Sequence, residues 1–133
     1  MTGYLVDTSI FIAAEQRRPL AEPPEGEARL SVATLTELHV GVLRAGSVKL
    51  RTLRQQTLEQ ARRFIALPYD QAVAERLAEF LAAARSKRRR AGAMDAIIAA
   101  TALVHDLTVW TQDDDFEVLS ELLPQLRVHR DAS

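Results

Sequence analysis

Short apolar segments that alternate with helical patterns constrain the fold of this chain more than any other feature. Tyr4 to Val6 is typical of a buried strand, and a polar turn follows it before an apolar helix at Ile10 to Ala14. A second strand is expected at Leu30 to Ala33, followed by a helix from Thr34 to the closing Ala45-Gly46. Leu107 to Thr111 predicts a further strand. Because such alternation builds parallel strands covered on both faces, we expect an α/β fold, a three-layer α/β/α sandwich around a mainly parallel sheet.

The rest of the chain is predicted to be mainly helical. Met94 to Val104 is apolar almost all round, which is typical of a helix buried between a sheet and its neighbours. Arg17 to Arg29 contains Pro19, Pro23, Pro24 and Gly26, so we expect a loop there. The remaining expected elements are helices at Leu50 to Ile65, Asp70 to Arg88 and Phe116 to Leu123, and a last strand at Leu126 to His129.

Composition excludes several kinds of site. The 133 residues, 47% hydrophobic and 26% charged, fit one folded domain over residues 1–133. The absence of cysteine excludes disulfides, thiolate nucleophiles and Cys-based metal sites. The three histidines form no pair on one helix face, so any metal must be held by oxygen. A net charge of -1 does not indicate attraction of the whole molecule to a polyanion.

The apolar segments are too short for a membrane span. The longest, Ala96 to Val104, is far below the roughly 20 residues that a spanning helix needs. The apolar opening reaches Asp7 with no basic leader or small-residue cleavage site. We therefore expect a cytoplasmic protein without a membrane partner.

Four acidic residues stand at expected element boundaries, namely Asp7, Glu37, Asp95 and Asp113. Each alone has a structural explanation: Asp7 can cap a helix, Thr34-x-x-Glu37 can form a capping box, and Asp95 and Asp113 can complement helix dipoles. Together they are harder to explain, because carboxylates gathered at one rim of a parallel sheet repel one another unless a cation neutralises them. Hard oxygen ligands select Mg²⁺ or Mn²⁺, and such ions activate water for phosphodiester hydrolysis.

The same residues lie in motifs that resemble a known family. The motifs are Leu5-Val6-Asp7-Thr8-Ser9, Thr36-Glu37-Leu38 with Gly41 one turn on, Met94 to Ala100, and Thr111-Gln112-Asp113 ending in Phe116. Their order and spacing resemble the PIN-domain nucleases, and most of all the VapC-type toxins of prokaryotic toxin-antitoxin modules. The resemblance covers essentially the whole chain and implies a PIN-like fold.

The resemblance implies a site and an activity. Asp7, Glu37, Asp95 and Asp113 would be the acidic metal site, with Thr8, Ser9 and Thr111 as supporting polar neighbours. Asp115 would assist or replace Asp113. The chain would then be an endoribonuclease that uses Mg²⁺ or Mn²⁺ to cleave structured RNA, such as transfer or ribosomal RNA, leaving a 5′-phosphate and a 3′-hydroxyl.

The resemblance also implies partners. A cognate VapB-like antitoxin would neutralise the toxin by laying its tail along a groove near the acids. The toxin would form a homodimer through the helices within Thr34 to Ile65, alone or in a larger toxin-antitoxin assembly.

Other polar and aromatic residues are open to two interpretations. The run Lys87, Arg88, Arg89 and Arg90 fits either a solvated helix end or an RNA-binding phosphate clamp near Asp95. Trp110 is expected in the strand core. His39 is given no role, because hydrolysis by activated water needs no imidazole base.

Two other functions stay open at this point. A catalytically silent PIN-like protein-binding module would keep the acids for folding, and its biological effect would survive Asp7→Asn or Asp95→Asn. A phosphotransfer receiver domain fits less well. It would place two acids after the first strand and a lysine after a late strand, and no late-strand lysine exists.

Overall fold

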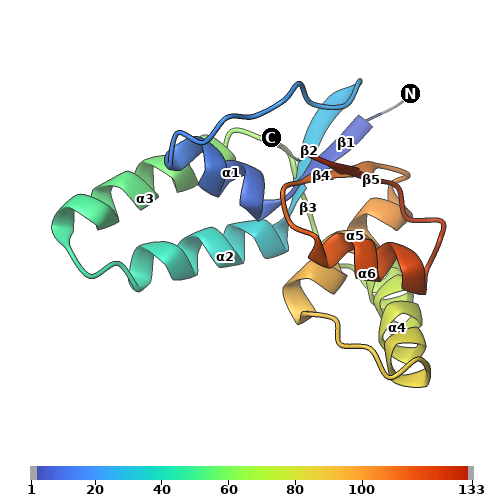
Figure 1. The fold of residues 1–133 in the computed structure, drawn as a ribbon. Coiled ribbons are helices and arrows are strands. Elements are labelled where there is room, and N and C mark those ends of the chain that lie inside the picture. The colour runs from blue at the N-terminus through green and yellow to red at the C-terminus, as the bar shows by residue number, and fades with distance from the viewer. Residues whose placement is uncertain (1–2, 132–133) are drawn as a thin grey trace.

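The computed structural model describes residues 3–131, which form a five-stranded sheet with every strand parallel to its neighbours. The strand order is β3-β2-β1-β4-β5 (Figure 1). The strands are β1 (Gly3–Val6), β2 (Glu27–Ser31), β3 (Ala66–Leu67), β4 (Thr108–Thr111) and β5 (Val128–Arg130). The expected α/β architecture with a mainly parallel sheet is confirmed.

Six helices cover the two faces of this sheet. They are α1 (Thr8–Glu15), α2 (Val32–Leu43), α3 (Val48–Ala61), α4 (Gln71–Ser86), α5 (Ala93–Val104) and α6 (Asp115–Leu122). Alternating side chains along each strand serve opposite faces. Leu5 and Val109 join the core cluster built mainly by α4, α5 and α6, whereas Val6 and Trp110 join the cluster of α1, α2 and α3. Figure 1 shows the two helix groups on either side of the strands.

Side chains at the carboxyl ends of the strands start the helices that follow. Asp7 comes directly after β1 and caps α1, because its carboxylate accepts a hydrogen bond from the Ser9 backbone N–H. Ser31, the last residue of β2, caps α2 in the same way through the N–H of Ala33. The turns that carry polar residues are therefore fixed at one edge of the sheet.

The second strand differs from the sequence prediction. We expected a loop from Arg17 to Arg29 and a strand at Leu30 to Ala33, but β2 begins at Glu27 and ends at Ser31. Val32 and Ala33 already belong to α2, because Ser31 provides the helix cap. The prolines end at position 24, which leaves Glu27 to Arg29 free to pair with β1.

The helix predicted at Leu50 to Ile65 is also wrong at its end. α3 stops at Ala61, and Ala66–Leu67 forms the short strand β3 beside Leu30 and Ser31. The preceding helix α2 ends at Leu43, two residues before the expected Ala45-Gly46 stop. The remaining boundaries differ from the predictions by one to two residues. No helix within residues 3–131 is long and apolar enough to cross a membrane.

Candidate active site

Asp7 lies at the bottom of the candidate site, with only 1% of its surface exposed. Its Oδ2 accepts hydrogen bonds from Ser9 Oγ (2.7 Å), Ser9 N (3.3 Å) and Thr111 Oγ1 (2.8 Å). Burial raises the pKa of Asp7 above its ordinary value, and these hydrogen bonds counteract part of that rise. A buried carboxylate is thus held in one orientation by groups from β4 and the first turn of α1.

The same hydroxyl groups position the turn that carries Asp113. Thr111 Oγ1 accepts a hydrogen bond from the Asp113 N–H at 2.9 Å, and Ser9 Oγ accepts one from the Gln112 N–H at 2.9 Å. The two hydroxyl oxygens are 3.1 Å apart. Ser9 and Thr111 therefore fix the geometry of two acids, as expected of supporting polar neighbours.

Glu37 reaches the site from the second turn of α2. Thr8 Oγ1 donates a hydrogen bond to Glu37 Oε1 at 2.7 Å, and Thr34 Oγ1 lies 3.2 Å from the Thr8 hydroxyl. Burial raises the pKa of Glu37, and the charges of Asp7 and Asp113 raise it further. The proposed Thr34-x-x-Glu37 capping box is wrong, because α2 begins earlier, at the Ser31 cap, and Glu37 is bound to Thr8.

Asp95 lies in the first turn of α5, where the helix dipole favours negative charge. Its pKa is nevertheless raised from 3.8 to about 7. Burial is the largest cause, followed by the charges of Asp7 and Glu37 and then of Asp115 and Asp113. The repulsion expected among gathered carboxylates is therefore present in the structure.

All four predicted acids line one cavity of about 190 Å³. The lining residues are Asp7, Thr8, Ser9, Ile12, Arg18, Glu37, Asp95 and Asp113. Asp115 is not among them, although its charge raises the pKa of Asp95 and of Asp113. Thr111 is fully buried and contacts Asp7 and the Asp113 backbone.

Sequence reasoning missed Arg18, which lines this cavity from the segment after α1. Its positive charge lowers the pKa of Asp113, opposing the rise caused mainly by burial and then by Asp7. A single arginine in a proline-containing loop has no periodicity or motif that marks it. Only the path of the backbone after α1 brings it to the acids.

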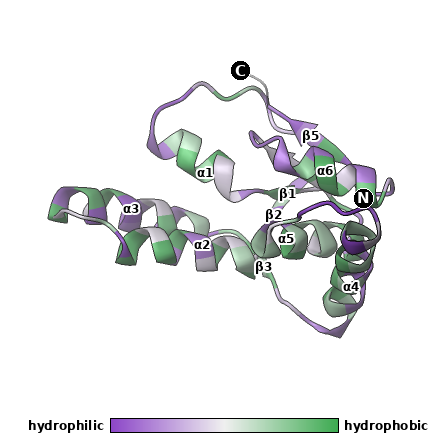
Figure 2. Cartoon of the chain, turned by 60° about the horizontal axis from the view of Figure 1, so that its bottom comes forward, coloured by the Kyte–Doolittle hydropathy of each residue, from purple (hydrophilic) through white to green (hydrophobic). Residues whose placement is uncertain are grey.

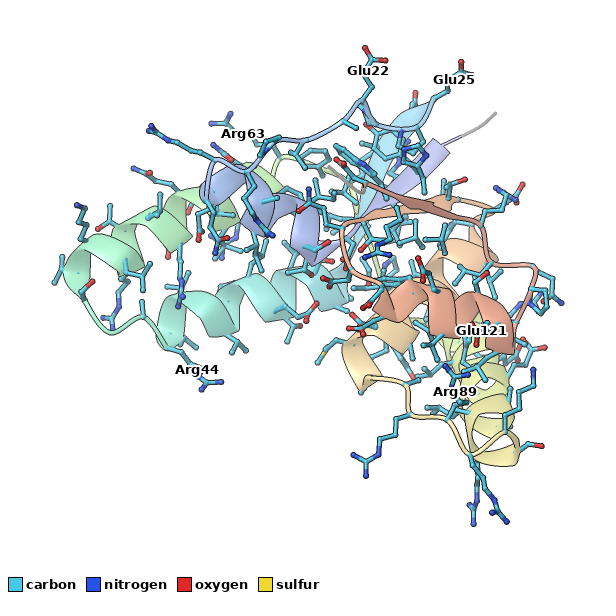
Figure 3. The ribbon with its side chains drawn as sticks, viewed as in Figure 1. Glu22, Glu25, Arg44, Arg63, Arg89 and Glu121 are labelled. Carbon is cyan, nitrogen blue, oxygen red and sulfur yellow. The ribbon has the colours of Figure 1, made fainter. Side chains whose placement is uncertain are left out.

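The basic run Lys87 to Arg90 lies elsewhere. Lys87 Nζ donates to the backbone carbonyl of Glu121, and Arg89 forms an ion pair with the Glu121 carboxylate at 2.9 Å. Figure 3 shows Arg89 beside Glu121 on α6. None of the four basic residues lines the acidic cavity.

Trp110 and His39 were not expected to take part in catalysis, and both make contacts with other side chains. Trp110 is 8% exposed and packs edge to face against Tyr4. His39 is exposed on α2, and its Nε2 accepts a hydrogen bond at 2.9 Å from Arg62, the C-cap residue of α3.

A larger groove continues from the acidic cavity. It has a volume of about 510 Å³ and shares Ile12 and Glu37 with the cavity. Its other lining residues are Glu15, Gln16, Leu38, Val40, Gly41, Arg44 and Arg54, from α1, α2 and α3. Charged groups of both signs and apolar side chains thus line a groove that reaches Glu37 of the acidic cavity.

The donor chemistry of the acidic cavity suits a hard divalent cation. The four carboxylates supply oxygen ligands, and their mutual repulsion is what a bound cation would relieve. No three acidic or histidine side chains within residues 3–131 are already spaced to enclose a metal ion. The oxygen donors nonetheless fit Mg²⁺, because this ion usually takes one or two carboxylates directly while water and substrate phosphate complete its shell.

Comparison with known proteins decides the family. The PIN domain model matches residues 4–122. The chain belongs to the PIN-domain family, among the VapC ribonuclease toxins. Ribonuclease VapC4 of Mycobacterium tuberculosis is 37% identical over 119 residues, which cover 89% of this chain and 92% of the relative. Ribonuclease VapC5 of the same organism is 41% identical over 117 residues, or 86% of each chain.

A solved structure agrees with this assignment. The crystal structure of VapBC-5 from Mycobacterium tuberculosis, a member of the VapBC family of toxin-antitoxin systems, matches with a TM-score of 0.83 and 34% identity. The match covers 98% of this chain and 99% of the other. The PIN-like fold and the resemblance to VapC toxins are confirmed.

Proposed function

We propose that this VapC-type ribonuclease is a divalent-metal-dependent endonuclease that cleaves structured RNA, such as transfer or ribosomal RNA, as the toxin of a toxin-antitoxin pair. The observation that carries the proposal is the convergence of Asp7, Glu37, Asp95 and Asp113 on one cavity. Carboxylates that raise one another's pKa have no evident structural benefit there, whereas a cation would stabilise all of them.

The four acids have distinct positions around the cavity. Asp7, Asp95 and Asp113 would hold Mg²⁺ or Mn²⁺ directly or through water, and Glu37, bound by Thr8, would be a further ligand or would orient the attacking water. A bound divalent ion polarises a phosphoryl oxygen and increases the acidity of water. Asp115, exposed beside Asp113, assists through its charge.

The lining of the cavity favours water as the nucleophile. No histidine is among the described residues that line it, so an imidazole base for the ribose 2′-hydroxyl is missing there. Attack by water on the phosphorus, with departure of the 3′-oxygen, gives a 5′-phosphate and a 3′-hydroxyl.

End-mapped sequencing of total RNA tests this function. Purified protein without antitoxin is incubated with the RNA in Mg²⁺, in Mn²⁺ and in EDTA, beside Asp95→Asn. We expect discrete cuts with 5′-phosphate ends that require the metal and vanish in the variant. Equal cutting by the wild type and Asp95→Asn would contradict the assigned site, and a lack of cutting in every condition would favour a silent binding module.

The groove beside the cavity is the proposed site of a VapB-like antitoxin. Ile12 and Glu37 belong to both hollows, so a peptide segment lying in the groove ends at the acids. Glu15, Glu37, Arg44 and Arg54 offer charges of both signs to such a segment. An antitoxin bound there would block RNA from the cavity.

The hairpin of α2 and α3 is the proposed homodimer surface. Its exposed large apolar side chains are Val40 (43% exposed), Leu43 (76%), Val48 (85%) and Leu53 (41%). Figure 2 shows hydrophobic segments along this hairpin, which extends away from the sheet. Exposed apolar area of this kind is typical of a subunit contact.

The basic run remains a proposed RNA contact outside the cavity. Lys87 and Arg89 are engaged with Glu121, whereas Arg88 and Arg90 are exposed and form no ion pair with another described residue. These two side chains are available to phosphates that flank the cleaved bond.

A further inference from the structure

Arg18 brings a positive charge to a cavity that is otherwise acidic. Of the described residues that line the cavity, it is the only cationic one. Its charge acts on Asp113, whose pKa it lowers. Arg18 therefore combines a place in the lining of the cavity with an electrostatic effect on Asp113.

The backbone after α1 fixes the position of Arg18. The Arg18 N–H donates to the Ala13 carbonyl at 2.8 Å, and the Arg17 N–H donates to the Ala14 carbonyl at 3.1 Å. Arg17 has a φ of 56°. These bonds and the left-handed residue form a Schellman motif, which turns the chain sharply at the end of the helix.

Contacts on the far side of Arg18 hold the same segment against the strand ends. Gln112 Nε2 donates to the Pro19 carbonyl at 3.3 Å, and the Ala21 N–H donates to Asp131 Oδ2 at 2.7 Å. The Asp131 N–H in turn donates to the Thr111 carbonyl at 2.7 Å. Arg18 is thus placed beside the turn that carries Asp113.

The guanidinium of Arg18 has no competing hydrogen-bond or ion-pair partner in the described part of the chain. Among residues 3–131 it forms neither a hydrogen bond nor an ion pair, although its charge lowers the pKa of Asp113. The side chain is also exposed to solvent. Its donors are therefore available to a ligand at the mouth of the cavity.

An RNA phosphate that approaches four carboxylates is repelled, and an arginine at the same cavity offsets that repulsion. A guanidinium can also bind two phosphate oxygens at once, which fixes the orientation of the phosphodiester. We propose that Arg18 binds an RNA phosphate at the acidic cavity and positions the phosphodiester for cleavage. This inference rests on the proposed nuclease function, and the experiments below separate the two.

Three variants test the role of Arg18 in cleavage. Arg18→Gln removes the charge, Arg18→Lys keeps it without the forked donors, and Arg17→Gln removes a neighbouring charge that does not line the cavity. Initial rates on total transfer RNA in Mg²⁺ are measured over a range of RNA concentrations. We expect kcat/KM to fall about tenfold or more in Arg18→Gln, to recover partly in Arg18→Lys, and to stay within about twofold in Arg17→Gln.

Binding gives a readout that does not require cleavage. Fluorescein-labelled transfer RNA is titrated with Asp95→Asn protein, alone and combined with Arg18→Gln or Arg17→Gln, at several salt concentrations. Loss of one phosphate contact should reduce the slope of log K against log salt by about 0.7 to 0.9 in the Arg18→Gln protein only. A purely structural role of Arg18 would leave this slope unchanged.

The outcomes distinguish the two proposals. Binding that depends on Arg18 without cleavage by the wild type would reject the nuclease function and keep the phosphate contact. Metal-dependent cleavage with equal rates and equal salt slopes for Arg18→Gln and Arg17→Gln would reject the role of Arg18 alone. A wild type that cleaves nothing in total RNA and does not bind transfer RNA would overturn both.

Discussion

The hydroxyl of Thr111 connects two of the four carboxylates of the proposed active site. It donates to Asp7 Oδ2 and accepts from the Asp113 N–H, with distances of 2.8 and 2.9 Å. Both acids thus depend on one side chain that is fully buried in β4. Removal of this hydroxyl should therefore slow RNA cleavage by more than the accompanying loss of stability explains.

Thr111→Val tests that dependence. The variant removes both hydrogen bonds with little change of shape, and we expect about 1 kcal/mol lower stability together with about tenfold slower RNA cleavage. Thr101→Val is the matched control, since Thr101 is also fully buried but donates within α5, to the Ile97 carbonyl. Urea unfolding and cleavage rates should show that both variants lose stability and that only Thr111→Val loses activity. Equal activity in the two would contradict the role of Thr111.

The raised pKa of Asp95 predicts how stability depends on pH in EDTA. Between about pH 4 and pH 7 the folded protein keeps a proton on Asp95 that the unfolded chain has lost, because the pKa is about 7 in the fold and 3.8 otherwise. The folded state then binds more protons, so its stability falls as pH rises through this range. Asp7, Glu37 and Asp113, whose pKa values are also raised, act in the same direction.

Urea unfolding at pH 5 and pH 8 measures this effect. The wild type should lose stability between the two pH values, and Asp95→Asn should lose less and be the more stable protein at pH 8. Identical losses of stability in the two proteins would show that Asp95 does not cause the pH dependence.

The residues of the site were predictable to different degrees. Asp7 and Asp113 follow strands and Asp95 lies in the first turn of a helix, and parallel strands bring their carboxyl ends to one edge, so sequence position predicted that these acids lie close together. Glu37 was placed correctly but explained wrongly as half of a capping box. Arg18 was not predictable, because a Schellman turn and tertiary hydrogen bonds place it.

At the scale of single elements, the end of α1 holds a strained residue. Arg17 adopts a φ of 56°, a conformation that favours glycine. Arg17→Gly should therefore stabilise the protein by about 1 kcal/mol.

A second glycine substitution serves as the control. Arg44 is the C-cap residue of α2 and has a φ of -93°, which any residue adopts without strain. Glycine at this position only increases the conformational freedom of the unfolded chain, so Arg44→Gly should lower stability. The midpoints of urea unfolding should move in opposite directions for the two variants. A shift of both in the same direction would exclude strain at Arg17.

The strand residues that sequence reasoning missed, the first half of β2 and all of β3, are those that depend on tertiary pairing. Glu27 to Arg29 carries two charges and follows a proline-rich loop, so its pattern does not indicate a strand. β3 has only two residues and exists because Leu30 and Ser31 offer a free edge. The helices, in contrast, were all predicted, since their periodicity extends over eight or more residues.

At the scale of the whole molecule, the α2–α3 hairpin should determine the oligomeric state. Val48→Glu places a charge at the most exposed of its apolar side chains and should convert a dimer into a monomer. Leu81→Glu, on α4, is the control, because Leu81 is 48% exposed but lies away from the hairpin. Light scattering coupled to size exclusion measures the mass of each. A wild type that is already monomeric, or a dimer that survives Val48→Glu, would contradict the proposed surface.

Two neighbouring aspartates separate the acids that line the cavity, to which we assign metal-dependent RNA cleavage, from an acid outside it. Asp113 lines the cavity, whereas Asp114 is exposed outside it and forms no side-chain cap on α6. Initial rates of RNA cleavage in Mg²⁺ are compared for Asp113→Asn and Asp114→Asn. We expect a loss of about 100-fold in Asp113→Asn and a change within about threefold in Asp114→Asn. Equal rates in the two variants, whether high or low, would contradict this assignment.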